Sequence, residues 1–129
     1  MILDTSAVLA ILFEEPEAPD FANAIGDAES CTISAATFVE VSIIVEARKG
    51  DGGIRMWDLF FREAGLVVEA VTEEHVRTAS RAWSKFGKGR HPAGLNFGDC
   101  FSYALAKITT EPLLFKGSDF SQTDIVPAL

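Results

Sequence analysis

Short apolar segments alternate with helical segments along the chain, and this alternation constrains the fold more than any other feature. The apolar runs are MILD at 1–4, CTI at 31–33, VVEAV at 67–71 and PLLF at 112–115. Runs of this length between turn residues are typical of buried strands. Strands that alternate with helices predict an α/β fold with a central, mainly parallel β-sheet flanked by helices on both faces. The 129 residues, 48% of them hydrophobic, suffice for one domain over 1–129.

Caps and breakers place the helices between these strands. Ser34 and Asn96 are good N-cap residues, and prolines open the second helix. The predicted helices span residues 7–13, 21–28, 35–49, 54–64, 72–86 and 96–108. We expect a loop at 50–53 and a mobile basic loop at 87–94 (GKGRHPAG), because both segments contain too much glycine for regular structure.

The cysteines and the N-terminus indicate the cellular compartment. Cys31 and Cys100 lie in apolar segments and form no CxxC or Cys/His cluster, so we expect reduced core thiols in a cytoplasmic protein. The apolar stretch after Met1 is interrupted by Asp4, is too short for a membrane span and lacks the basic start of a signal peptide. We therefore expect a native start and no membrane association.

Four acidic residues stand where a strand is expected to end or where a helix is otherwise apolar. They are Asp4, Glu40, Asp99 and Asp119. No lysine or arginine lies within three positions of the first three, whereas Lys116 precedes Asp119 by three. A carboxylate among residues that favour burial is costly unless a cation compensates it. A hard divalent cation with oxygen ligands would compensate all four.

Each acid also has a structural explanation. Asp4 can cap the first helix, Asp99 can form a capping box with Asn96, and either Asp119 or Asp124 can cap a turn. Asp119 is preferred over Asp124 for the acidic site because it lies nearer the strand end.

Glu40 is the hardest of the four to explain by capping. Its helical neighbours are Ala36, Thr37, Ile43 and Ile44, which form an apolar face apart from one hydroxyl. A buried, hydrogen-bonded glutamate remains the alternative to a ligand.

Basic residues are concentrated in one stretch of an acidic chain. The net charge is −8, yet no acidic residue lies between His75 and Gly98, where five basic residues fall. These are Arg77, Arg81, Lys85, Lys88 and Arg90. Such a stretch can bind a phosphate backbone, although a solvated helix face would show the same pattern.

Four ordered motifs carry a family resemblance over nearly the whole chain. They are ILDTSAVLAIL, TFVEVSIIVEAR, GLNFGDCFSYALAK and LLFKGSDFSQTDI. These segments resemble the PIN-domain family, in particular VapC-type toxins of type II toxin–antitoxin modules. The resemblance implies a PIN-like three-layer α/β/α domain and a metal-dependent endoribonuclease that cleaves RNA, with tRNA as a candidate substrate.

The resemblance also implies a site. Asp4, Glu40, Asp99 and Asp119 would be the catalytic acids and the ligands of Mg²⁺ or Mn²⁺, with Thr5 and Ser6 as neighbouring active-site hydroxyls. Lys85, Lys88, Arg90 and His91 are the candidates for contacts with the RNA substrate. A homodimer and a complex with a cognate VapB-type antitoxin, which would direct a basic segment toward the acids, are also implied.

Two other readings compete with a metal-dependent nuclease. A phosphatase of the haloacid dehalogenase type would need an aspartate where this chain has Ser6, and a receiver-type site would need a paired acid and a mid-chain acceptor, so both fit poorly. A non-catalytic RNA-binding or protein-interaction module would use the acids only to cap helices and turns.

Overall fold

A computed structural model describes all residues 1–129 and shows one four-stranded sheet in which every pairing is parallel. The strands are β1 (Ile2–Leu3), β2 (Thr32–Ser34), β3 (Val67–Glu69) and β4 (Leu113–Leu114), in the order β3-β2-β1-β4. In β1, Ile2 is in register with Thr32 on one side and Leu113 on the other. The predicted parallel sheet is confirmed, and β1 lies inside it.

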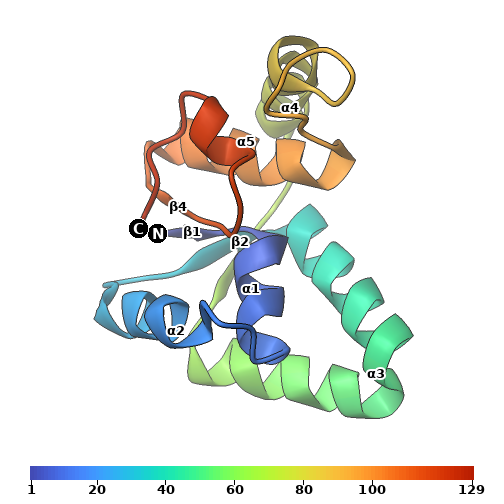
Figure 1. The fold of residues 1–129 in the computed structure, drawn as a ribbon, viewed down its shortest axis with the longest axis vertical. Coiled ribbons are helices and arrows are strands. Elements are labelled where there is room, and N and C mark those ends of the chain that lie inside the picture. The colour runs from blue at the N-terminus through green and yellow to red at the C-terminus, as the bar shows by residue number, and fades with distance from the viewer.

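Helices cover both faces of this sheet (Figure 1). They are α1 (Thr5–Leu12), α2 (Ala18–Asp27), α3 (Ala35–Glu63), α4 (Glu73–Phe86) and α5 (Phe97–Thr109), followed by the 3-10 turn η1 (Phe120–Gln122). Ile2 packs into a core with α4 and α5, whereas its neighbour Leu3 packs into a second core with α1, α2 and α3. Because successive strand residues point to opposite faces, two-residue strands serve both cores. The three-layer prediction is confirmed.

The element α3 contains the break that the sequence predicted, because its two helical arms meet at a kink at Gly50. The predicted loop over 50–53 is reduced to this one residue. Only Gly50 leaves helical geometry, with φ 57° and ψ −143°, and α3 then continues to Glu63. Gly53 is buried at the bend, and a Cβ added there would lie 2.8 Å from the carbonyl carbon of Val45. The chain turns sharply at one left-handed glycine, and a second glycine lets the two arms pack closely. Figure 1 shows the resulting elbow.

The glycine-rich segment 87–94 forms no helix or strand, as predicted, but backbone hydrogen bonds pair its two ends. Leu95 N donates to Phe86 O and Lys88 N donates to Leu95 O, both at 2.9 Å, which gives a parallel bridge between Gly87 and Leu95. His91 Nδ1 accepts from Ala93 N at 3.0 Å. Side-chain and backbone acceptors thus fix a segment whose composition alone indicated no regular structure.

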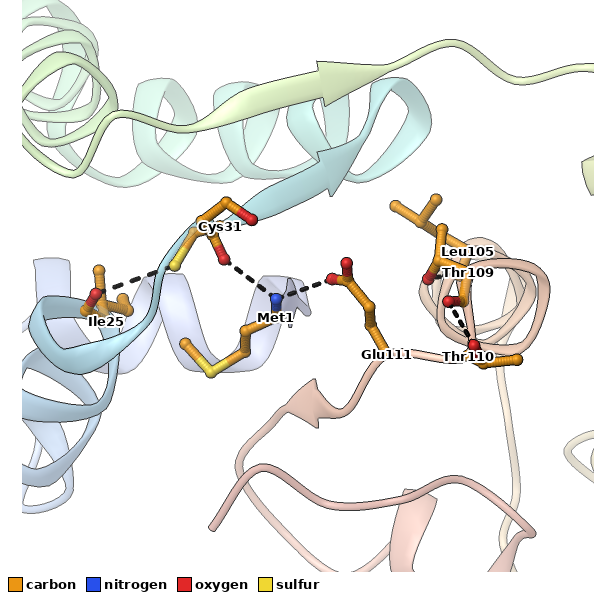
Figure 2. A network of polar contacts seen from close by, with 8 residues as sticks. Met1, Ile25, Cys31, Leu105, Thr109, Thr110 and Glu111 are labelled. Carbon is orange, nitrogen blue, oxygen red and sulfur yellow. Dashed lines mark hydrogen bonds and ion pairs between the residues drawn. The ribbon is translucent and has the colours of Figure 1, made fainter.

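The start of β1 is held from both sides. The Met1 ammonium donates to Ser30 O at 3.0 Å and to Glu111 Oε2 at 2.7 Å, between β2 and the turn that precedes β4 (Figure 2). Cys31 and Cys100 are buried and free, as predicted. None of the helices has the length and apolarity that a membrane span requires.

Alanine substitutions at Gly53 in the α3 elbow and at Gly26 in α2 are expected to have different effects on the free energy of unfolding. Gly53→Ala is expected to lower the free energy of unfolding by about 1–3 kcal/mol, because the methyl group would overlap the backbone of the first arm. Gly26→Ala is the matched control, since nothing lies within 4 Å of a Cβ there, and it is expected to be neutral or stabilising by up to about 1 kcal/mol. Urea denaturation of both variants measures the difference. Equal effects would contradict close packing at Gly53.

Candidate active site

The four predicted acids are brought to the carboxyl edge of the sheet by four different elements. Asp4 follows β1, Glu40 lies in the second turn of α3, Asp99 in the first turn of α5, and Asp119 between β4 and η1. Electrostatics show that they share one neighbourhood, because Asp4, Glu40 and Asp119 each raise the pKa of Asp99. Residues up to 115 positions apart in the sequence therefore form one acidic cluster.

Asp4 is buried, with 2% of its surface exposed, and its two carboxylate oxygens differ. Oδ2 accepts hydrogen bonds from Ser6 N at 2.9 Å and from Ser6 Oγ at 2.6 Å, as an N-cap residue does. Oδ1 is buried and has no hydrogen-bond partner. Helix capping therefore accounts for only one oxygen, and an unpaired buried carboxylate oxygen is costly.

Glu40 is enclosed between α1 and α5. Thr5 Oγ1 donates a short hydrogen bond to Glu40 Oε1. On the other side, a Cβ added at Gly98 would lie 2.7 Å from Glu40 Cδ, so the glycine leaves room for the carboxylate in its present position. Glu40 of α3 thus occupies the space beside Gly98 that a side chain in the first turn of α5 would otherwise fill.

The helix face around Glu40 is less buried than its composition indicated. Thr37 is buried, and its hydroxyl lies 3.2 Å from that of Ser102 in α5, but Ile43 is 62% exposed. The sequence analysis did not identify the Thr37–Ser102 pair. The one sequence feature that points to it is spacing, because Thr37 lies three positions before Glu40 and Ser102 three positions after Asp99. This pair joins α3 to α5 one turn away from both Glu40 and Asp99.

Asp99 combines the predicted capping box with an acidic environment. Its backbone N donates to Asn96 Oδ1 and its Oδ2 accepts from Asn96 N, both at 2.9 Å. Burial and, to a smaller extent, the neighbouring carboxylates raise the pKa of Asp99 to about 7, although the Asn96 N–H lowers it. The capping box is present, yet the surroundings of Asp99 still disfavour its charged form relative to its protonated form.

Asp119 and Asp124, the two aspartates near the C-terminus, have different environments in the structure. Asp124 accepts from Tyr103 Oη at 2.6 Å and from Lys107 Nζ at 3.0 Å, and these bonds lower its pKa although burial opposes them. Asp119 is exposed, and its side chain makes no capping bond. Asp119 is therefore the free carboxylate that faces Asp99, whereas Asp124 is already paired.

Comparisons with known proteins place the chain in a family. The PIN domain family matches residues 1–126. Ribonuclease VapC of Mycolicibacterium smegmatis is 46% identical over 125 residues, which cover 97% of each chain. This chain belongs to the PIN-domain family, in its VapC branch.

Solved structures show that this PIN domain has the VapC fold. The crystal structure of Mycobacterium tuberculosis VapC20, a toxin that cleaves the sarcin-ricin loop, superposes with a TM-score of 0.78 at 16% identity over 97% of this chain and 95% of that chain. VapBC2 from Rickettsia felis, bound to a DNA fragment from its promoter, superposes with a TM-score of 0.76 at 12% identity over 98% and 94%. At these identities the agreement concerns the fold.

The acidic cluster of this PIN domain fits a divalent cation by its chemistry. Five ion pairs are present in the chain, and none involves any of the four acids. The buried, unpaired Oδ1 of Asp4 and the mutual repulsion of the carboxylates are both relieved by a hard cation. No three acidic side chains stand close enough to ligate one ion as they are, so binding would require side-chain adjustment.

The predicted RNA-contact residues lie around the end of α4 and the turn that leads into α5. Lys85 lies over the Phe86 ring and Arg90 over the Trp83 ring, each at 4.9 Å from the ring centroid. The His91 ring meets Phe86 edge-on, and Lys88 is exposed. Figure 1 shows this turn at the α5 end that carries Asp99. None of these residues forms an ion pair with the acids.

The raised pKa of Asp99 predicts how the stability of the metal-free protein depends on pH. The folded chain holds a proton up to about pH 7, whereas the unfolded chain releases it near the ordinary value of 3.8. The contribution of Asp99 to stability should therefore fall as the pH rises from about 4 to about 7, by an amount on the order of 2 kcal/mol. Asp99→Asn should remove this decline in chemical denaturation series, and the exposed Asp58→Asn should keep it. An unchanged slope in Asp99→Asn would contradict the shift.

Proposed function

We propose that this protein is the toxin of a type II toxin–antitoxin module and acts as a metal-dependent endoribonuclease. The observation that carries the proposal is the cluster of four carboxylates around the unpaired, buried Oδ1 of Asp4, none of which has a cationic partner in the chain. The printed names of the relatives, ribonucleases of the VapC type, support the reaction class.

The acids would hold Mg²⁺ or Mn²⁺, with Asp4 and Asp99 as the foremost ligands and Glu40 and Asp119 ligating directly or through water. When bound, such an ion supplies Lewis-acid activation of water and neutralises charge that develops on a phosphate. Thr5 orients Glu40 by its hydrogen bond, Ser6 orients Asp4, and one of the carboxylates accepts the proton of the attacking water. The products would be the two fragments of a hydrolysed phosphodiester.

The basic residues between α4 and α5 would bind the RNA backbone beside this cluster. Lys88 and Arg90 project from the turn that runs directly into the acid-bearing end of α5, and His91 is held by Ala93. Lys85 lies in the last turn of α4. Phosphate contacts of this kind position a nucleic acid without reading its sequence, and a structured RNA such as tRNA is the proposed substrate class.

Removal of a single acid should abolish cleavage. Asp4→Asn and Asp99→Asn are each expected to slow RNA cleavage by on the order of 100-fold or more, because each removes a charge that the cation requires. Asp58→Asn, an exposed aspartate in the second arm of α3, is the matched control and should cleave normally. Single-turnover cleavage of end-labelled cellular RNA measures the rates, and chelation by EDTA should reproduce the loss.

The same assay tests the alternative of a non-catalytic RNA-binding module. RNA binding without cleavage at any concentration of Mg²⁺ or Mn²⁺ would favour that module. Cleavage that persists in EDTA, or in both asparagine variants, would contradict the metal-dependent nuclease.

The proposed inhibitor is a cognate VapB-type antitoxin. The structural neighbour from Rickettsia felis is a VapBC pair, and a second neighbour is a toxin–antitoxin complex from Klebsiella pneumoniae. The net charge of −8 and the acidic cluster favour a partner with a basic segment. Such a segment would supply the cations that the four acids lack within their own chain.

We also propose a homodimer formed through α4 and α5. A groove of about 580 Å³ lies between these helices, and Val76, Trp83 and Phe97 around it are 49%, 42% and 80% exposed. Glu73 lies at one end of α4, and Arg90 covers Trp83 at the other. An antiparallel second copy would bring opposite charges together at both ends, as a two-fold interface requires.

Charge exchange tests this dimer. Glu73→Arg and Arg90→Glu should each weaken self-association in sedimentation velocity, because each places like charges opposite one another, whereas an equimolar mixture of the two variants should recover the dimer. Glu29→Arg, an exposed acid outside the groove, serves as the control. Dimers of unchanged stability in both single variants would contradict the proposed face.

A further inference from the structure

The Ser6 hydroxyl joins two segments that are 110 residues apart. Ser6 Oγ donates to Asp4 Oδ2 at 2.6 Å and accepts from the backbone N of Lys116 at 2.9 Å. A hydroxyl has one proton, which is committed to Asp4, and Lys116 N occupies one of its acceptor positions. The end of β1 and the segment after β4 are therefore connected through a single side chain.

This connection fixes the orientation of the Asp4 carboxylate. Oδ2 receives two donors from Ser6, the backbone N at 2.9 Å and the hydroxyl at 2.6 Å, while Oδ1 receives none. Two donors on one oxygen, together with burial of the whole residue, restrict rotation of the carboxylate. The free oxygen is thereby held in one position.

The same connection anchors the segment that carries Asp119. Lys116 begins the turn Lys116–Asp119, in which Gly117 adopts a φ of 95°, and the Asp119 side chain makes no capping bond. The Lys116 side chain pairs with Glu15 and Glu17, but these groups are each about a third exposed and such pairs contribute little. The bond from Lys116 N to Ser6 thus ties the start of this turn to α1, whereas its end is held by Gln122 N, which donates to Asp119 O at 3.2 Å, and by the buried Phe120.

We propose that Ser6 is a positioning residue for the cation site, whose hydroxyl holds Asp4 and the Asp119 segment in mutual register. This inference rests on the proposed function, since it concerns two of the proposed ligands. Groups that orient metal ligands typically change metal affinity by 10–100-fold when removed. Ser6 would act through Asp4 and Asp119 without contacting the ion itself.

Calorimetric titration of the purified chain with Mn²⁺ tests this role. Ser6→Ala keeps the backbone N–H that caps Asp4 and removes only the hydroxyl, so Mn²⁺ affinity should fall by about 10–100-fold. Ser6→Thr restores a hydroxyl and should recover the affinity. Ser84→Ala, which removes an exposed hydroxyl bonded to its own helix at Ser80 O, should leave the affinity unchanged.

A double-variant comparison tests the connection to Asp119. In an Asp119→Asn background, Ser6→Ala should reduce Mn²⁺ affinity by a smaller factor than in the wild type, because part of its effect passes through Asp119. If Ser6→Ala lowers Mn²⁺ affinity by the same factor in both backgrounds, the proposal that Ser6 holds Asp4 and the Asp119 segment in register is overturned. Thermal unfolding of the metal-free variants separates loss of folding from loss of binding. Ser6→Cys is a further control, because its side chain is similar in size but is a weaker hydrogen-bond donor.

The outcomes distinguish this proposal from the function on which it rests. If the wild type binds Mn²⁺ and Ser6→Ala binds it equally well, the positioning role is overturned while the nuclease proposal stands. If the wild type binds no Mn²⁺, both are overturned. Recovery of affinity in Ser6→Thr, with unchanged folding in Ser6→Ala, would support the role.

Discussion

Repulsion among four carboxylates at one edge of the sheet is the constraint on which the rest of the site depends. A parallel sheet directs the carboxyl ends of its strands to one side, and here β1 and β4 deliver Asp4 and Asp119 there, while α3 and α5 add Glu40 and Asp99. The neutral contacts around them, from Thr5, Ser6 and Gly98, orient these charges without neutralising them. Folding therefore assembles a negative potential that is relieved by a proton on Asp99 or by an external cation.

Much of the fold could be predicted from the sequence because local signals and tertiary packing agree. The apolar runs became the strands, and the cap residues Ser34, Thr72 and Asn96 begin α3, α4 and α5 as their side chains dictate. The break between the two arms of α3 was predicted from the glycines at 50–53, but not its reduction to the single residue Gly50, because glycine in a helix, a loop or a left-handed bend has the same sequence signature. The segment 87–94 forms no helix or strand, as predicted, but the contacts at Phe86, Leu95 and His91 that order it are not visible in composition.

The sequence indicated which acids lie near one another, but not the contacts that each of them makes. All four acids lie in one cluster, but their roles as ligands and catalysts remain predictions. The sequence ranked Asp119 above Asp124 only by its distance from the strand end, since the physical difference lies in Tyr103 and Lys107, which reach Asp124 across the fold. Nothing in the sequence indicates that Glu40 reaches Gly98 from another helix.

The contact between Gly98 and Glu40 has a consequence for the way such chains can diverge. Because the glycine has no side chain, the longer acid from α3 reaches the first turn of α5, and the two positions share a fixed volume. A larger residue at position 98 would therefore displace the flexible end of the Glu40 side chain from its present position. Substitution at position 98 is thus expected to change where the acid in α3 places its charge, so the two positions are coupled when such chains diverge.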